Sequence, residues 1–133
     1  MKKLVAFFAL FALIATLVAA CGGSTPSTSS NGSAGSGNTV HLSDATFAQT
    51  SITIKKGESV NLVNDVSAVH IIQNGAWDSS GSPKSAKEAG APDVQAVQVQ
   101  GGGSQTVGPF TTAGTFQLYC TVHPGMNLTV VVQ

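Results

Sequence analysis

Three side chains that are good ligands for soft transition metals fall within seven residues near the C-terminus. Cys120, His123 and Met126 have the spacing C-x2-H-x2-M, and Pro124 and Gly125 bend the chain between the last two. A thiolate, an imidazole and a thioether are donors that copper accepts in either common oxidation state. The spacing therefore predicts a metal site on one tight loop, with a further ligand from elsewhere in the chain.

The other histidines of the chain are His41 and His70. His70 lies in the strand-like run 67–72 in the middle of the chain, and a neighbouring strand could deliver it to the loop. We expect His41, which stands beside a Gly/Ser-rich stretch, to be exposed and without a role. Two imidazoles, one thiolate and a weak thioether form the donor set of blue-copper electron-transfer sites. Zinc more often has extra cysteines or a carboxylate.

Period-two patterns predict the elements that must position this loop. Apolar residues alternate with polar ones at Ile52 and Ile54, Val60 and Leu62, Val97 and Val99, Phe116 to Cys120, and Leu128 to Val132. Such short alternating runs are typical of half-buried strands, so we expect an antiparallel sandwich. Cys120 shares a face with Phe116 and Leu118, so its sulfur should point into the core at the end of a strand.

The segment 77–93 has no alternating pattern and contains Pro83 and Pro92. We predict a long surface loop there, with one helical turn around 85–89. Its charged side chains Lys84, Lys87 and Glu88 are expected to form a solvated face.

The N-terminus has the features of an export signal. Lys2 and Lys3 precede the uncharged run 4–20, which ends in Leu-Val-Ala-Ala-Cys at Cys21. That ending resembles the lipobox of bacterial lipoproteins, so we expect cleavage before Cys21 and lipidation of its thiol. The protein would then be anchored on the outer face of the cytoplasmic membrane. Plain secretion and an uncleaved anchor are the alternatives.

The composition divides the rest of the chain into a tether and one domain. Residues 22–38 are Gly, Ser, Thr, Ala and Asn with one proline, which predicts a flexible tether over 21–38. The folded domain is then 39–133, large enough for one core. Loss of Lys2 and Lys3 with the signal peptide 1–20 leaves four lysines against six acidic residues, a net charge of −2. This balance excludes a nucleic-acid binder.

The loop from Cys120 to Met126, followed by a valine-rich final strand, resembles the cupredoxins, most closely the plastocyanin, pseudoazurin and amicyanin group. The resemblance covers 39–133 and implies a Greek-key β-sandwich of about eight strands. It also implies His70, Cys120, His123 and Met126 as the ligands of one copper ion. The chain departs from this group at Ile71, where the group often has a polar residue that forms a hydrogen bond near the thiolate.

These features together predict a membrane-tethered carrier of single electrons that is a monomer and not an enzyme. Redox partners would dock briefly on an apolar patch around His123, formed by Pro124, Gly125 and Val122. A copper carrier or storage protein with the same ligands is the main alternative. A thiol enzyme that uses Cys120 and His123 is disfavoured, because it leaves Met126 without a role. An Ig-like adhesion module without metal is the structural alternative.

Overall fold

The computed structural model describes residues 37–133 of the chain. The predicted signal peptide 1–20, the predicted lipidation site Cys21 and nearly all of the predicted tether lie outside these residues. Within the described part, no helix is long and apolar enough to cross a membrane.

Residues 37–133 form ten β-strands and no helix. The strands are β1 (Thr39–Leu42), β2 (Ser51–Ile54), β3 (Val60–Asn64), β4 (His70–Asn74), β5 (Ala76–Trp77), β6 (Pro83–Lys84), β7 (Val97–Val99), β8 (Ser104–Val107), β9 (Gly114–Cys120) and β10 (Asn127–Val132).

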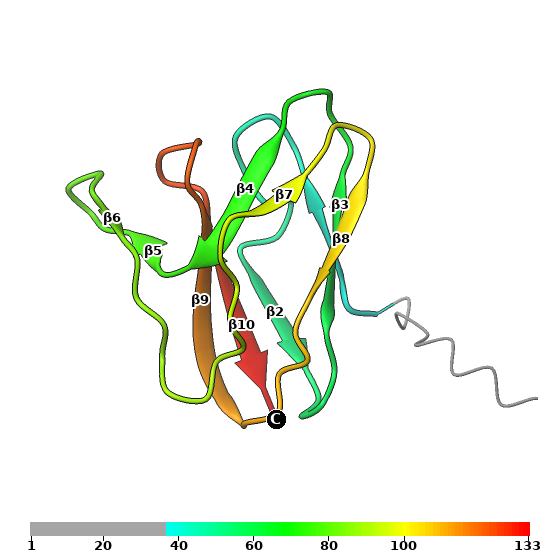
Figure 1. Cartoon of the computed structure of the whole chain (residues 1–133), viewed down its shortest axis with the longest axis vertical. Coiled ribbons are helices and arrows are strands. Elements are labelled where there is room, and N and C mark those ends of the chain that lie inside the picture. Colours follow the sequence, from blue (N-terminus) through cyan, green and yellow to red (C-terminus); the bar gives the residue numbers. More distant parts are fainter. Residues whose placement is uncertain (1–36) are drawn as a thin grey trace, which may run out of the picture. The chain divides into compact units, whose positions relative to one another are not determined.

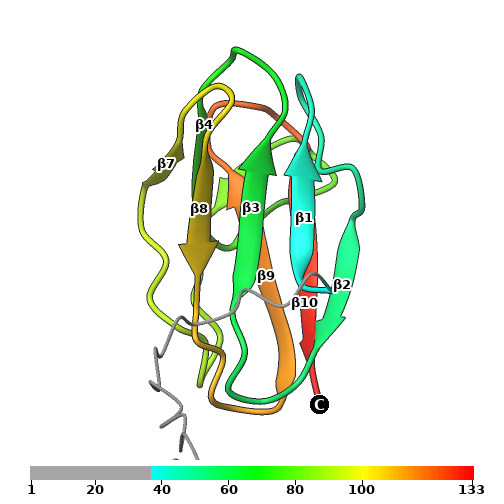
Figure 2. The ribbon, with the colours of Figure 1, turned by 90° about the vertical axis from the view of Figure 1, so that its right-hand side faces the viewer.

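Eight of these strands build two sheets that face each other, which confirms the predicted all-β sandwich (Figure 2). One sheet has the order β1-β3-β8 and the other the order β2-β10-β9-β4-β7. The prediction of a purely antiparallel sandwich was wrong, because β1 pairs with β3 and β10 pairs with β2 in parallel. Both parallel pairs join strands that the chain reaches only after crossing to the other sheet and back, so no hairpin turn links them.

The core lies between the sheets and follows the alternation of the sequence. In β10 the residues Leu128, Val130 and Val132 are buried, and the residues between them are partly exposed. Phe116 on β9 stacks near Phe110, with ring centroids 5.7 Å apart. Close packing of these side chains makes the sheets a stiff support for the loops at their ends.

The remaining two strands correct the prediction for segment 77–93. β5 and β6 form a small antiparallel hairpin, and no helical turn occurs over 85–89. The Asp78 carboxylate accepts hydrogen bonds from the backbone amides of Ser80 and Ser82, so it closes the turn of the hairpin. At Gly75 the chain leaves β4 with a φ of +120°, and a side chain there would overlap the backbone of Lys84.

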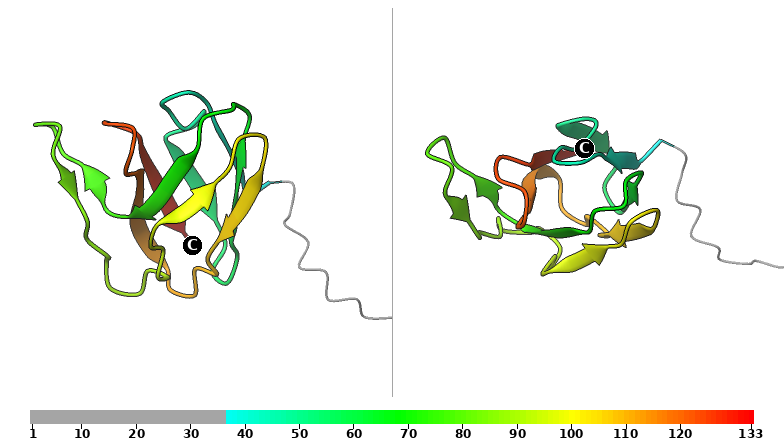
Figure 3. Two further views of the ribbon diagram at one scale, coloured as in Figure 1. Left: turned by 45° about the horizontal axis from the view of Figure 1, so that its top comes forward. Right: turned by 90° about the horizontal axis from the view of Figure 1, so that it is seen from above.

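β4 and β9 are antiparallel neighbours in the five-stranded sheet, with Ile72 opposite Cys120. The start of β4 and the end of β9 therefore lie at the same end of the sandwich (Figure 1). The β9–β10 loop projects from that end, and the β5–β6 hairpin projects beside it, which both views of Figure 3 also show. The predicted ligands thus come from strands that the sheet itself brings together.

Candidate metal centre

Strand register places His70 beside Cys120. His70, Ile72 and Asn74 are the buried residues of β4, so the His70 ring faces inward from the first position of the strand. Cys120 is the last residue of β9 and is opposite Ile72. As predicted, its side chain points inward and is fully buried. The Cys120 Sγ lies 3.7 Å from the Nδ1 of His70.

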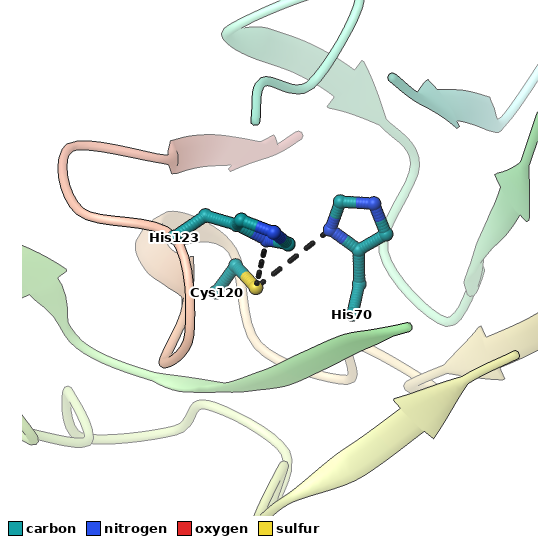
Figure 4. A group of neighbouring side chains, drawn as sticks. All are labelled: His70, Cys120 and His123. Carbon is teal, nitrogen blue, oxygen red and sulfur yellow. Dashed lines mark hydrogen bonds between the residues drawn. The ribbon is translucent and has the colours of Figure 1, made fainter. Parts of the chain in front are cut away.

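The β9–β10 loop brings the second imidazole to the same sulfur. The Nδ1 of His123 lies 3.3 Å from the Cys120 Sγ, and the rings of His70 and His123 are 4.6 Å apart (Figure 4). One donor atom from each of these three residues lies within 4.8 Å of the others. The structure therefore gathers two imidazole nitrogens and one thiol sulfur at a single point.

Met126 is the buried end of this loop, with 1% of its surface exposed. The Cys120 amide donates to the Met126 carbonyl at 3.0 Å, and the Met126 amide donates to the His123 carbonyl at 3.2 Å. Gly125, with a φ of +78°, supplies the left-handed turn that closes the loop. Met126 is thus held by backbone hydrogen bonds to two of the three gathered residues.

The four predicted ligands differ in their access to solvent. His70, Cys120 and Met126 are buried, whereas His123 is partly exposed and is preceded by Val122, which is 46% exposed. His41 lies apart from the group and is exposed, and its Nδ1 is 2.8 Å from the Asp65 carboxylate. The site therefore reaches solvent through His123 on the loop.

Hydrogen bonds that the sequence did not reveal support Cys120 and His70. Ile71, which has no polar side chain, accepts a hydrogen bond from the Thr121 amide through its carbonyl at 2.8 Å. The buried Asn64 amide donates to the carbonyls of Ala68 and Val99 and fixes the turn before His70. The run Asn64-Asp65-Val66-Ser67 contains three turn-forming residues, a signal that could have indicated this role.

Burial lowers the pKa of His70 below its usual value of 6.5. The neighbouring His123 lowers the pKa further, and the backbone of Ser43 and the carboxylate of Asp44 oppose the shift. Desolvation disfavours the imidazolium form, so His70 offers a free lone pair at neutral pH. A neutral imidazole is the form that binds a metal ion.

We expect the copper-free protein to lose stability as the pH falls below about 6.5. Well above that pH His70 is neutral in both the folded and the unfolded protein, so it adds nothing to the slope of the free energy of unfolding against pH. Below it the unfolded chain takes up a proton that folded His70 resists, so acid favours unfolding. Urea titrations of the copper-free protein between pH 7.5 and 5 measure this slope. In His70→Gln the slope should be smaller, and an equal slope in both proteins would contradict the prediction.

The donor set fits copper. Zinc sites built from Cys and His usually have four such ligands, and this group offers one thiol and two imidazoles beside a buried thioether residue. Residues 35–133 match the family model of copper binding proteins of the plastocyanin/azurin family. The chain belongs to this family. The cofactor of this copper-binding protein is accordingly one copper ion, which the gathered donors fit.

Solved structures similar to this copper-binding protein agree on the fold. An amicyanin variant in its reduced Cu(I) form at pH 4 is 23% identical, with a TM-score of 0.57 over 75% of this chain and 85% of that chain. Amicyanin from Paracoccus versutus (Thiobacillus versutus) is 21% identical, with a TM-score of 0.55 over 74% and 82% of the two chains. A comparison with curated proteins found no match.

Proposed function

We propose that this protein is a type 1 (blue) copper protein that transfers single electrons between redox partners. The observation that carries the proposal is the convergence of the Cys120 thiol with the Nδ1 atoms of His70 and His123. Met126 completes the proposed ligand set as a weak thioether donor. When bound, copper supplies a reversible one-electron couple. The packed strands and the short loop hold the donors in one geometry, which keeps reorganisation small.

Burial of the donors favours electron transfer over copper delivery. Transfer of the metal to another protein requires incoming ligands to reach it, and His70, Cys120 and Met126 have at most 1% of their surface exposed. An electron needs no such opening, because it can leave through a partly exposed ring such as that of His123. The same enclosure leaves no side for a substrate, so we expect no enzymatic activity.

We propose that partners dock on apolar surface beside His123. Val122 and Val69, each next to an imidazole donor in the chain, are the exposed large hydrophobic residues of the described part, and Pro124 and Gly125 are exposed as well. Small apolar patches suit brief contacts, which a carrier that serves two partners needs. The low charge of the domain is consistent with docking through such a patch.

We further propose that a lipid on Cys21 tethers a monomeric domain to the outer face of the cytoplasmic membrane. The lipobox-like sequence before Cys21 and the Gly/Ser-rich stretch after it support this. The predicted tether of about 17 residues would, as a Gly/Ser-rich linker, give the domain a reach of a few tens of Å. The mass of the N-terminal peptide tests the anchor, and an unmodified Cys21 in the membrane fraction would overturn it.

Addition of Cu(II) to the purified protein tests the function. We expect an intense visible absorption from thiolate-to-copper charge transfer, and reversible oxidation and reduction without loss of the metal. A measured reduction potential and self-exchange rate would establish electron transfer. Loss of copper in one oxidation state would instead favour the carrier alternative, and a colourless protein would exclude a blue copper site.

A further inference from the structure

The β5–β6 hairpin is tied to both ends of the ligand loop. The indole Nε1 of Trp77 donates to the carbonyl of Cys120 at 2.8 Å. The backbone amide of Trp77 donates to the Oδ1 of Asn127 at 2.8 Å, and the Nδ2 of Asn127 donates back to the Trp77 carbonyl at 3.0 Å. Asn127 directly follows Met126 in the chain. One residue of β5 thus bridges Cys120, the first residue of the ligand loop, and Asn127, which directly follows its last residue.

Packing holds Trp77 in this position. Its ring meets the edge of Tyr119 at 89°, with centroids 5.9 Å apart. The Tyr119 hydroxyl in turn forms hydrogen bonds with Ser85 and Gln73, both at 2.8 Å. Tyr119 points away from the core, yet only 2% of its surface is exposed. The β5–β6 hairpin and the residue that follows it, which together we call the hairpin segment, cover this face of β9 through Trp77 and Ser85. The indole is therefore fixed by contacts independent of its hydrogen bond to Cys120.

The hydrogen bonds that join Trp77 to Cys120 and Asn127, which we call the bridge, support the ligand loop in a way that the side chains next to the loop do not. Ile71 contributes its carbonyl alone, and the loop's other hydrogen bonds join backbone atoms of Cys120, His123 and Met126. Among the hydrogen bonds of residues 37–133, the indole is the one side-chain donor to the backbone of Cys120. A hydrogen bond to this carbonyl fixes the peptide plane from which the Cys120 side chain projects.

We propose that Trp77 and Asn127 are positioning residues of the metal centre. They hold the two ends of the loop at a fixed separation, so that the Cys120 sulfur stays buried against the two imidazoles. Without them the loop would open more often, exposing the thiol and allowing the donors to move. This proposal rests on the proposed copper function for its metal readouts, but its effect on the thiol exists without copper.

The first test uses the full-length protein without copper. The variants Trp77→Phe, which keeps an aromatic ring, and Asn127→Leu, which keeps the size, each remove part of the bridge. We expect the rate of Cys120 alkylation by iodoacetamide to rise about fivefold, as for the loss of one net hydrogen bond. Peptide mass spectrometry assigns the label to Cys120, so that Cys21 does not contribute.

Tyr119→Phe is the matched control, since it removes the hydrogen bonds of the Tyr119 hydroxyl with Ser85, next to the hairpin, and with Gln73 of β4, but leaves the bridge. We expect its Cys120 to react at nearly the wild-type rate. If both bridge variants react at the wild-type rate, or if Tyr119→Phe reacts as fast as they do, the positioning role is wrong.

The second test adds copper. Both bridge variants should bind it with a shifted charge-transfer band and a changed reduction potential, whereas Tyr119→Phe should match the wild type. Unchanged bands and potentials in the bridge variants would contradict the proposal even if the wild type is blue. A colourless wild type would overturn the copper function, while the alkylation rates would still decide whether Trp77 and Asn127 position the loop.

Discussion

Replacing Cys120 by alanine is expected to abolish the intense visible absorption of the copper-loaded protein. The band requires a thiolate bound to Cu(II), and Cys120 is the cysteine whose sulfur meets the two imidazole nitrogens. His70 and His123 would remain, so weak copper binding without strong colour is the expected residual. Absorption and electron paramagnetic resonance spectra of both proteins, each loaded with one equivalent of Cu(II), measure the change.

The fold should survive this substitution. Cys120 is a small buried side chain, and its truncation to alanine should cost only about 1 kcal/mol in the free energy of unfolding. Urea unfolding of the copper-free proteins checks this. Cys21→Ser, which changes the other cysteine of the chain, is the matched control and should keep the band. A blue Cys120→Ala protein would show that the thiolate ligand is not Cys120.

The variant Val122→Asp is expected to slow electron self-exchange by about tenfold or more at low salt. On the proposed docking, two copies meet through the surface around His123 during self-exchange, and Val122, the residue before His123, is 46% exposed. A carboxylate on each copy would repel the other and would keep water in the contact. Nuclear magnetic resonance line widths in mixtures of reduced and oxidised protein give the rate.

A control variant at a distant position and a salt titration distinguish this effect on the rate from the effect of a changed net charge. The matched control is Ala113→Asp, because Ala113 is exposed and stands just before β9, at the opposite end of the strand from Cys120. It should leave the rate nearly unchanged. The Val122→Asp defect should shrink as salt is raised, because screening weakens repulsion between exposed charges. Equal rates in the two variants would argue against docking at His123.

Solvent access and rigidity are divided between different parts of the site. β4 and β9 supply the buried donors His70 and Cys120, whose positions follow from the sheet. The loop supplies His123, which is partly exposed. The copper ion would thus be enclosed by the core on one side and lie one imidazole ring from the surface on the other. We expect this asymmetry to direct electron exchange to one end of the molecule.

The sequence by itself was sufficient for the features that depend on local periodicity and spacing. Alternation with period two determines which face of a strand is buried, so the burial of Phe116, Leu118 and Cys120 on one face could be predicted. The three loop donors are close in the chain, and Pro124 and Gly125 can bend it in only a few ways. The sandwich and the three loop donors followed from these local rules, whereas His70, 50 residues earlier in the chain, was implied as a ligand by the resemblance to the cupredoxins.

Tertiary structure alone decided the features that depend on contacts between distant segments. Periodicity does not encode strand order, so the parallel pairs β1–β3 and β2–β10 were not predictable. β5 and β6 are two residues each, too short for any pattern, and their hairpin is stabilised by contacts with residues about 50 positions away. Trp77 and Asn127 therefore meet only in the folded structure, in which β9 and β10 are paired. The sequence specified which donors are present, whereas the packed fold decided how they are held.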